Sequence, residues 1–363
     1  MNNKTQTHYF FIMLLLLTST HTQGMINSVI ATINTGVTPA GIAITPNGHT
    51  AYVANNNNYA IDNQDSVTVI DLKNNTIKTT IHDDSFDQPY TITINPDGTK
   101  AYVTNSNSTT ITIIDTKTNE VMGIIDGFDG PSGMAISPNG RRAYVNNYGA
   151  ENQSGLGKSV SFVSLVMNTI LGEIEVGQAP AALVMSPDGQ YVYVINYIDG
   201  NPDTGTMSII QTSDNMVIDT IPGFSGPFDI ALTPNGKYAF VTNFGSNNFT
   251  PIGTTVSVVN VRDHAIVATI DLGIQPSGVA ITPDGHFAYV TNYNTLYADS
   301  TNFTDLTAGQ GTVSIIKVKK QKVVPPTIAV EQSPHGITIA PDGRHAYVTN
   351  FTSNTVSVIK IKN

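Results

Sequence analysis

Apolar and polar positions along this chain follow a pattern that repeats seven times. In the first repeat, a short apolar run is followed by a Pro-Asn-Gly turn, a second apolar run and two further runs with polar residues between them. Large and small residues alternate within a run, as in Ile42 and Ile44 on either side of Ala43, so both faces of each strand are suited to burial. The pattern predicts four strands per repeat, in the first repeat at residues 41–45, 51–54, 67–71 and 77–81.

Two features of the repeat keep a constant spacing. Each turn begins with a proline, at Pro46, Pro96, Pro138, Pro187, Pro234, Pro283 and Pro341. Nine residues later the second strand ends with the asparagine of a Tyr/Phe-Val-x-Asn tetrad, at Asn55, Asn105, Asn147, Asn196, Asn243, Asn292 and Asn350. Successive repeats lie roughly 40–60 residues apart, a period typical of four-stranded propeller blades.

The ends of the chain predict how the ring of repeats closes. The seventh repeat has three strands and no fourth strand before Asn363. Residues 28–36 (SVIATINTG) resemble the fourth strand of the fifth repeat, residues 265–273 (AIVATIDLG). We therefore predict an all-β, seven-bladed β-propeller of four-stranded antiparallel blades, in which the N-terminal strand completes the last blade.

Residues 1–24 have the layout of a secretory signal peptide. Lys4 precedes an apolar run at residues 9–17, and polar residues 18–23 follow it. No later stretch approaches the roughly 20 apolar residues that a membrane helix requires. The chain has no cysteine, which excludes disulfides, iron–sulfur clusters, a lipid anchor on cysteine and covalent haem. We expect an exported protein, in the periplasm, on the cell surface or outside the cell, whose residues 25–363 form a single propeller domain.

The segments AYVAN, AYVTN, AYVNN, VYVIN and AFVTN, each after a Pro-Asp/Asn-Gly turn and before strands such as SVTVID, resemble the YVTN family of β-propellers. The resemblance covers essentially all of residues 25–363. It implies a seven-bladed, YncE-like propeller exported by bacteria or archaea, with surface-layer components among the members. Related seven-bladed propellers include lactonases, a streptogramin lyase and electron-transfer subunits, so the fold leaves the activity open. The Glu-x-His pair that characterises the lyase is absent here.

The seven tetrad asparagines have a structural explanation. Each ends a strand, where its side chain can bond its own backbone as the chain turns. We therefore look for function where the repeats differ, which is mainly in the connections between second and third strands. These connections lie, together with the connections between blades, on one face of the ring, which we call the top face. Long loops on one face of a rigid scaffold are typical of a binding surface, and drift in tolerant loops is the alternative explanation.

Charge supports a functional role for the top face. Sorted by this topology, most acidic residues fall on the top face with Lys158 as the single base, whereas most lysines and arginines fall on the opposite, bottom face. The whole chain has a formal charge of -10 at pH 7. This distribution favours a cation or a basic protein as the partner of the top face and disfavours nucleic acid.

One top-face loop has oxygen ligands at the spacing of a calcium loop. Asp199, Asn201 and Asp203 are two residues apart, as in EF-hand loops. Thr204, however, occupies the position where an EF-hand needs glycine, and no glutamate closes the loop. A structural Ca²⁺ site and a solvated acidic loop are therefore both open.

A second candidate site lies at the top mouth of the predicted central channel. In each repeat a first proline stands seven residues before the turn proline, as Pro39 stands before Pro46. The residue after this first proline lies at the start of the innermost strand, and it is Tyr90, Phe228 and His335 in repeats two, five and seven. The next position is glycine, threonine or alanine in six repeats and Asp229 in the fifth. These four residues are candidates for binding a small ligand, and Asp229 and His335 for transferring a proton. The alternative is an Asp229 that is only solvated by channel waters.

Two functions fit this sequence. The first is an exported binding or scaffold protein whose acidic top face contacts a protein or a small ligand. The second is a metal-assisted hydrolase or lyase of the lactonase kind, with Asp229 and His335 at the mouth of the channel. His49, His286 and His345 fall in bottom-face turns, too dispersed for a metal triad.

Overall fold

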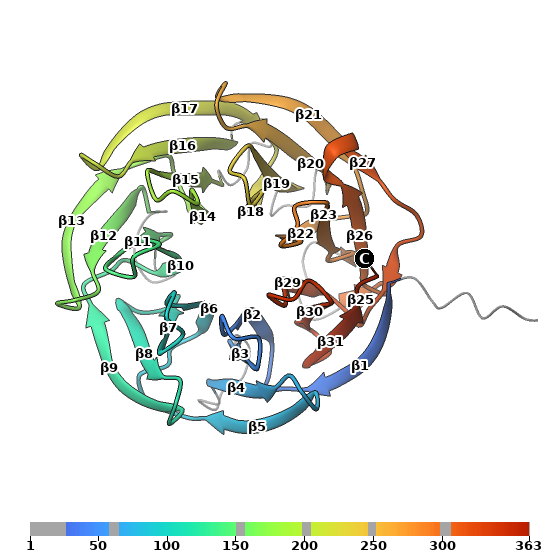
Figure 1. Ribbon diagram of the computed structural model, residues 1–363, viewed down its shortest axis with the longest axis horizontal. Helices are drawn as coiled ribbons and strands as arrows, with labels where there is room; N and C mark the ends of the chain where they lie inside the picture. The colour runs from blue at the N-terminus through green and yellow to red at the C-terminus, as the bar shows by residue number, and fades with distance from the viewer. Residues whose placement is uncertain are drawn as a thin grey trace, which may run out of the picture.

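The computed structural model describes residues 27–57, 65–149, 157–197, 205–245, 252–297 and 306–362. Its strands form seven antiparallel sheets arranged in a ring around a central channel (Figure 1). Each sheet is one propeller blade, with one strand beside the channel and its last strand at the rim (Figure 1). The predicted all-β, seven-bladed propeller is confirmed.

The blades are numbered in chain order. Blade 1 contains β2 (Pro39–Ile44), β3 (Thr50–Asn55), β4 (Ser66–Asp71) and β5 (Thr76–Ile81). Blade 2 contains β6 (Pro89–Ile94), β7 (Lys100–Asn105), β8 (Thr110–Asp115) and β9 (Glu120–Asp126). Blade 3 contains β10 (Pro131–Ile136), β11 (Arg142–Asn147), β12 (Ser159–Ser164) and β13 (Thr169–Glu175). Blade 4 contains β14 (Pro180–Met185), β15 (Tyr191–Asn196), β16 (Gly205–Gln211) and β17 (Met216–Phe224).

The remaining blades close the ring. Blade 5 contains β18 (Pro227–Leu232), β19 (Tyr238–Gly245), β20 (Ile252–Asn260) and β21 (Ala265–Asp271). Blade 6 contains β22 (Pro276–Ile281), β23 (Phe287–Asn292), β26 (Thr312–Lys317), β27 (Lys322–Val323) and β28 (Ile328–Ala329), with the short 3-10 helix η1 at Val318–Lys320. Blade 7 contains β29 (Pro334–Ile339), β30 (His345–Asn350), β31 (Thr355–Lys360) and β1 (Ser28–Asn34).

The N-terminal strand completes the last blade, as predicted. Strand β1 pairs antiparallel with β31, from Ser28 opposite Lys360 to Asn34 opposite Thr355. Just before β1, the side-chain Oδ1 of Asn27 accepts hydrogen bonds from the Tyr289 hydroxyl and from the backbone N–H of Lys362, both at 3.1 Å. Asn27 therefore joins the beginning of the described chain to its end and to blade 6.

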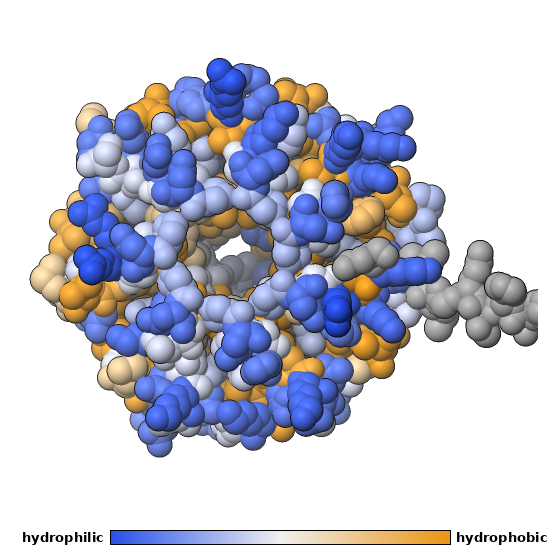
Figure 2. Space-filling model, in the orientation of Figure 1, coloured by the Kyte–Doolittle hydropathy of each residue, from blue (hydrophilic) through white to orange (hydrophobic). Residues whose placement is uncertain are grey.

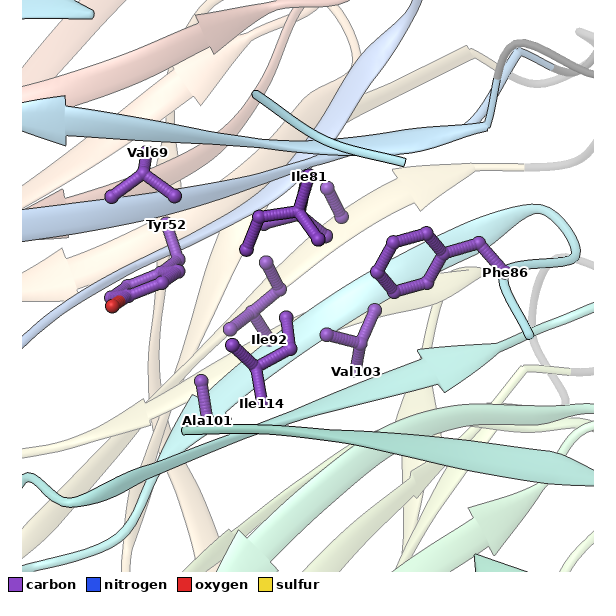
Figure 3. Close-up of a cluster of buried hydrophobic side chains, with 10 residues drawn as sticks. Tyr52, Val69, Ile81, Phe86, Ile92, Ala101, Val103 and Ile114 are labelled. Carbon is purple, nitrogen blue, oxygen red and sulfur yellow. The ribbon is translucent and has the colours of Figure 1, made fainter. Parts of the chain in front are cut away.

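Neighbouring residues of each second strand face different blade interfaces, because side chains alternate across a strand. In blade 1, Tyr52 belongs to a buried cluster with Phe86 and Ile92 of blade 2 (Figure 3), whereas Val53 packs with Tyr347 of blade 7. The same division holds around the ring, so the core consists of seven hydrophobic clusters, one at each blade interface. The Tyr/Phe-Val part of the tetrad is thus a packing motif.

The tetrad asparagines join the second strand of each blade to the third. In blade 1, Nδ2 of Asn55 donates to Ser66 Oγ at 3.1 Å and to Thr68 Oγ1 at 2.9 Å. The same two bonds recur in all seven blades. Their role is structural, but the expectation that they bond their own backbone is wrong. The register places Asn55 directly opposite Ser66, so third-strand hydroxyls are the nearest partners.

The Pro-Asn/Asp-Gly turns pack against one another at the bottom of the channel. Their glycines have φ between 67° and 74°, a left-handed conformation that glycine adopts without strain. A Cβ on Gly189 would lie 2.9 Å from Cδ of Pro138 in the preceding blade, and one on Gly48 would lie 3.7 Å from Cδ of Pro341. Each turn glycine meets the turn proline of the preceding blade in this way. The channel remains open, as the centre of Figure 2 shows.

Blade 6 departs most from the repeat. Its outer strand is split into β27 and β28, because Pro325 and Pro326 lie between them and have no N–H to donate to the ladder. Its connection from β23 to β26 contains a short hairpin, β24 (Thr295–Tyr297) paired with β25 (Leu306–Ala308), which the sequence pattern did not predict. In blade 5, β19 and β20 also extend into their connection and pair at Gly245 and Ile252.

The predicted signal peptide, residues 1–24, lies outside the described residues. Within the described ranges, η1 is the only helical element, and no helix is long and apolar enough to cross a membrane.

Candidate functional site

The site begins with an unusual backbone conformation at the top end of each innermost strand. The residue before the first proline has φ between 47° and 55° in every blade. These residues are Thr38, Gln88, Gly130, Ala179, Gly226, Gln275 and Ser333. A left-handed conformation costs about 1–2 kcal/mol for a residue with a Cβ. In return, its carbonyl accepts the N–H of the residue after the tetrad asparagine, as Gln275 does from Tyr293 at 2.9 Å.

The four residues predicted at the mouth of the channel lie in β-bulges. In every blade, the register between the first and second strands shifts just after the proline. A bulge leaves its residues outside the regular ladder and redirects their side chains. Tyr90, Phe228, Asp229 and His335 lie in the bulges of blades 2, 5 and 7 and line one cavity. The structure therefore brings together all four residues of this predicted site.

Five more aromatic side chains line the cavity, and the sequence analysis missed them. They follow the tetrad asparagine in blades 3 to 7 and are Tyr148, Tyr197, Phe244, Tyr293 and Phe351. The backbone bonds to the left-handed residues hold them at the mouth. The signal was present in the sequence, because an aromatic residue at the same offset in five of seven repeats is a repeated feature in its own right.

The cavity occupies the top mouth of the channel and has a volume of about 550 Å³. Innermost strands of all seven blades contribute to its wall. Its deeper part is apolar, with Ile42, Ile92, Met134, Leu183 and Ile337. Its size and mostly apolar lining are those of small-molecule sites.

Aromatic rings of blades 5, 6 and 7 form a connected group around His335. The His335 ring centroid lies 5.4 Å from that of Phe228, 6.5 Å from Tyr293 and 5.8 Å from Phe351. Phe244 completes the group, 5.2 Å from Phe228 and 5.9 Å from Tyr293. Several neighbouring rings stand nearly perpendicular, at 83° for Phe228 and His335, which is the edge-to-face arrangement that aromatic pairs prefer.

His335 is held as a neutral ring. The hydroxyl of Tyr90 lies 3.2 Å from His335 Nε2, and the ring also forms a hydrogen bond with the Ala40 backbone. Burial lowers the pKa of His335 to about 4, and the bond to Ala40 opposes this shift only in part. Since a neutral ring has one N–H, which the Ala40 carbonyl accepts, Nε2 is the acceptor for the Tyr90 hydroxyl. Burial also raises the pKa of Tyr90 well above its usual range, so this hydroxyl keeps its proton.

Asp229 is a half-buried carboxylate in the wall of the cavity. Its Oδ1 accepts the N–H of Ile230 at 2.8 Å, and its Oδ2 accepts the N–H of Val279 in blade 6 at 2.9 Å. Burial raises the pKa of Asp229 to about 6, and the two backbone bonds oppose this shift. Asp229 is thus ionised at neutral pH but more basic than an ordinary aspartate. In the described chain it forms no ion pair with His335, since the innermost strand of blade 6 lies between their strands.

The family model of the lactonase, seven-bladed β-propeller group matches residues 16–122 and 210–363. The chain belongs to this family. The narrower resemblance to YncE-like YVTN propellers stays a prediction. A search of curated proteins found no match to the chain.

Among solved structures, this lactonase-family propeller is similar to the hydrazine synthase of Kuenenia stuttgartiensis. The two are 22% identical with a TM-score of 0.74, and the match covers 89% of this chain and 95% of the other. At this identity the likeness shows the fold alone.

The structure does not describe the other predicted site of this lactonase-family propeller. Asp199, Asn201 and Asp203, the candidate Ca²⁺ ligands, are outside the described residues. Over the part of the chain that is described, no group of three or more His, Asp or Glu side chains is placed to hold a metal ion. Among the described residues, the connections at the top face carry acids such as Asp84 and Asp129, and Lys158 is their only lysine or arginine.

Proposed function

We propose that this lactonase-family propeller binds a small molecule in the cavity at the top mouth of its channel. The observation that carries the proposal is the cavity itself, whose described lining has aromatic side chains from six blades and a single carboxylate, Asp229. Large apolar walls with a few fixed polar groups are typical of binding sites. Backbone hydrogen bonds also hold the main chain of each of the five aromatic residues that follow a tetrad asparagine.

A variant that fills the cavity tests this function. Ala181 follows the first proline of blade 4, at the position that Tyr90 and Phe228 occupy in blades 2 and 5. Ala181→Phe therefore places in blade 4 a side chain that the repeat already accommodates. Thermal melts with panels of lactones, monosaccharides, aromatic carboxylates and alkylammonium salts should show at least one class that raises the Tm of the wild type but not of Ala181→Phe. A ligand at 100 times its Kd adds about 2.7 kcal/mol to the free energy of unfolding.

The control for this experiment places the same new side chain outside the cavity. Val166 is 74% exposed on the rim, so Val166→Phe should keep the response of the wild type. A panel without any response, or a response that Ala181→Phe retains, would contradict the proposed site.

Hydrolysis of a lactone is the second candidate function, favoured by the family match together with the basicity of Asp229. In this reaction the Asp229 carboxylate would take a proton from water as the water oxygen attacks the lactone carbonyl. The ring C–O bond then breaks, and the departing alkoxide takes the proton back from Asp229.

Substitution separates binding from catalysis. A hydrolase that uses Asp229 as its base should lose about 100-fold or more in kcat in Asp229→Asn, while the same ligand still binds. His335→Gln should have a smaller effect, because His335 is neutral and takes no part in these proton transfers. Lactone hydrolysis by the wild type that both variants retain would place catalysis elsewhere, and no hydrolysis of any γ- or δ-lactone would leave binding alone.

Export stays part of the proposal. Residues 1–24 supply the signal-like layout that supports it. N-terminal sequencing of the protein recovered from the culture medium or the periplasm should begin between residues 20 and 25. A cytoplasmic protein with an intact Met1 would contradict it.

A further inference from the structure

The charge inside the cavity identifies the class of ligand. Asp229 carries the only formal charge among the described residues that line it, because His335 is neutral. A neutral or anionic ligand would displace water from this carboxylate and leave it without a counter-charge, which is unfavourable for a partly buried ion. A cation would instead neutralise it. The charge therefore favours a cationic ligand.

The wall beside Asp229 offers aromatic rings to that cation. Phe228 precedes Asp229 in the same bulge, and its ring is 5.2 Å from Phe244, which is 5.9 Å from Tyr293. Rings attract a positive charge placed over their faces, and the attraction is larger where water is excluded. Phe244 and Tyr293 stand at 66° to each other, like adjacent walls of a box.

The hydrogen bonds of Asp229 favour one kind of cation. Each carboxylate oxygen already accepts one backbone N–H, from Ile230 and from Val279, so about half of the acceptor sites of Asp229 are taken. Apart from tyrosine hydroxyls, the neutral polar side chains of the described residues that line the cavity belong to blades 1 to 3, not to the blades of the ring group, and they are Asn56, Gln88, Thr91, Ser106 and Ser132. A primary ammonium would bring three N–H groups that need acceptors, whereas a quaternary ammonium carries its charge without any N–H group.

We infer that the ligand of this cavity is an organic cation with a quaternary ammonium group. The rings of Phe228, Phe244 and Tyr293 and the charge of Asp229 would hold this group. The inference rests on the proposed function of the cavity as a small-molecule site. The acidic top face adds to it, because a negative field around the mouth attracts cations from solution.

Isothermal titration with three matched probes tests the inference. Tetramethylammonium and choline both carry a quaternary ammonium group, and 3,3-dimethyl-1-butanol has the shape of choline without its charge. At constant ionic strength, the two cations should bind the wild type at one site per chain, at least ten times more tightly than the neutral analogue. Binding of the neutral analogue within threefold of choline would overturn the inference.

Variants identify the groups responsible. Asp229→Asn should weaken choline at least tenfold, and Phe244→Leu, which keeps the site apolar but removes a ring, should weaken choline several-fold without weakening the neutral analogue. The control Asp84→Asn removes an exposed top-face acid outside the cavity and should change the Kd less than twofold. Unchanged choline binding in Asp229→Asn, or equal losses in Asp84→Asn, would also overturn the inference.

The outcome also separates this inference from the proposed function. A lactone, sugar or carboxylate that raises the Tm of the wild type but not of Ala181→Phe, with no binding of the two cations, would refute the cationic ligand and keep the cavity as the site. No cavity-dependent binding of any probe would refute both.

Discussion

The hydroxyl of Tyr90 in blade 2 lies 3.2 Å from Nε2 of His335 in blade 7, at the mouth of the channel. Blade 1 separates these blades, and it has the small Ala40 where they have Tyr90 and His335. The bond therefore joins two blades that are not neighbours in the ring. It also occupies the acceptor nitrogen of His335, which keeps the ring oriented beside the aromatic group.

We expect Tyr90→Phe to lower the free energy of unfolding by about 1–3 kcal/mol, because Nε2 of His335 loses its partner inside the protein. Denaturant unfolding measures the change. The control is Tyr238→Phe, which alters a half-buried tyrosine at the bottom end of blade 5. Equal stability of Tyr90→Phe and the wild type would mean that this bond contributes nothing.

Asp229 makes stability depend on pH with a definite sign. Because burial raises its pKa from 3.8 to about 6, the folded protein keeps a proton between about pH 4 and 6 that the unfolded chain has released. Asp229 thus lowers stability as the pH rises through this window. We expect the stability of Asp229→Asn relative to the wild type to rise between pH 4 and 7, by at most about 3 kcal/mol.

Denaturant unfolding at several pH values measures this difference. His335, with its pKa lowered to about 4, has the opposite effect, since stability is lost as the pH falls from about 6.5 towards 4. His335 is present in both proteins and cancels in the difference, as does Asp65, whose pKa burial raises to about 6. A difference in stability that does not change with pH would show that Asp229 has the same pKa in the folded and the unfolded protein, which would contradict this prediction.

Ring closure depends on the N-terminal strand. Removal of residues 25–36 would leave the outer edge of β31 unpaired and would expose the core around Ile33, which is 6% exposed. Burial of one such side chain contributes about 1.5–3 kcal/mol, so the Tm should fall by several degrees and the protein should tend to aggregate through the open edge. An unchanged Tm would refute the closure.

A point variant tests the same closure more finely. Asn27→Gly keeps the left-handed backbone, with φ of 52°, but removes the acceptor for Tyr289 and Lys362. We expect a loss of about 1–2 kcal/mol. The matched control is Asn75→Gly at the equivalent turn of blade 1, where φ is 53° and Oδ1 has no hydrogen-bond partner. Equal losses would assign the effect to the backbone alone.

The contact between turns predicts unequal costs for one substitution at two equivalent glycines. Gly189→Ala and Gly48→Ala share the penalty for φ near 70°, about 1 kcal/mol. Only the new methyl group at 189 would press on its neighbour, 2.9 Å from Pro138 rather than 3.7 Å from Pro341. Thermal melts should therefore show a larger loss for Gly189→Ala, and equal losses would argue against the tight turn contact.

The repeat made the fold predictable from the sequence. Pro46 and Asn55 fix the turn and the end of a strand, and their constant offset in seven repeats leaves little freedom in where the strands lie. The position of His335 at the mouth also followed from the repeat, because the residue after the first proline begins the innermost strand. Asp229 stood out because its equivalents are small.

Other parts of the site depend on features that local pattern does not reveal. The left-handed conformation of Thr38 was unforeseen, because a residue before proline prefers an extended backbone. The partners of Asn55 depend on the register of β3 against β4. Tyr148 and Phe351 were missed because they follow asparagines that already had a structural explanation. Their place in the cavity depends on backbone bonds to residues of left-handed conformation, which the sequence pattern does not predict.

Native mass spectrometry of the wild type and Ala181→Phe, each with the small molecule that gives the largest thermal shift, tests the central claim most directly. The proposed cavity site predicts one bound molecule per chain in the wild type and none in Ala181→Phe at the same concentration. The same occupancy in both proteins, or several weakly bound molecules per chain, would contradict a ligand site at the mouth of the channel.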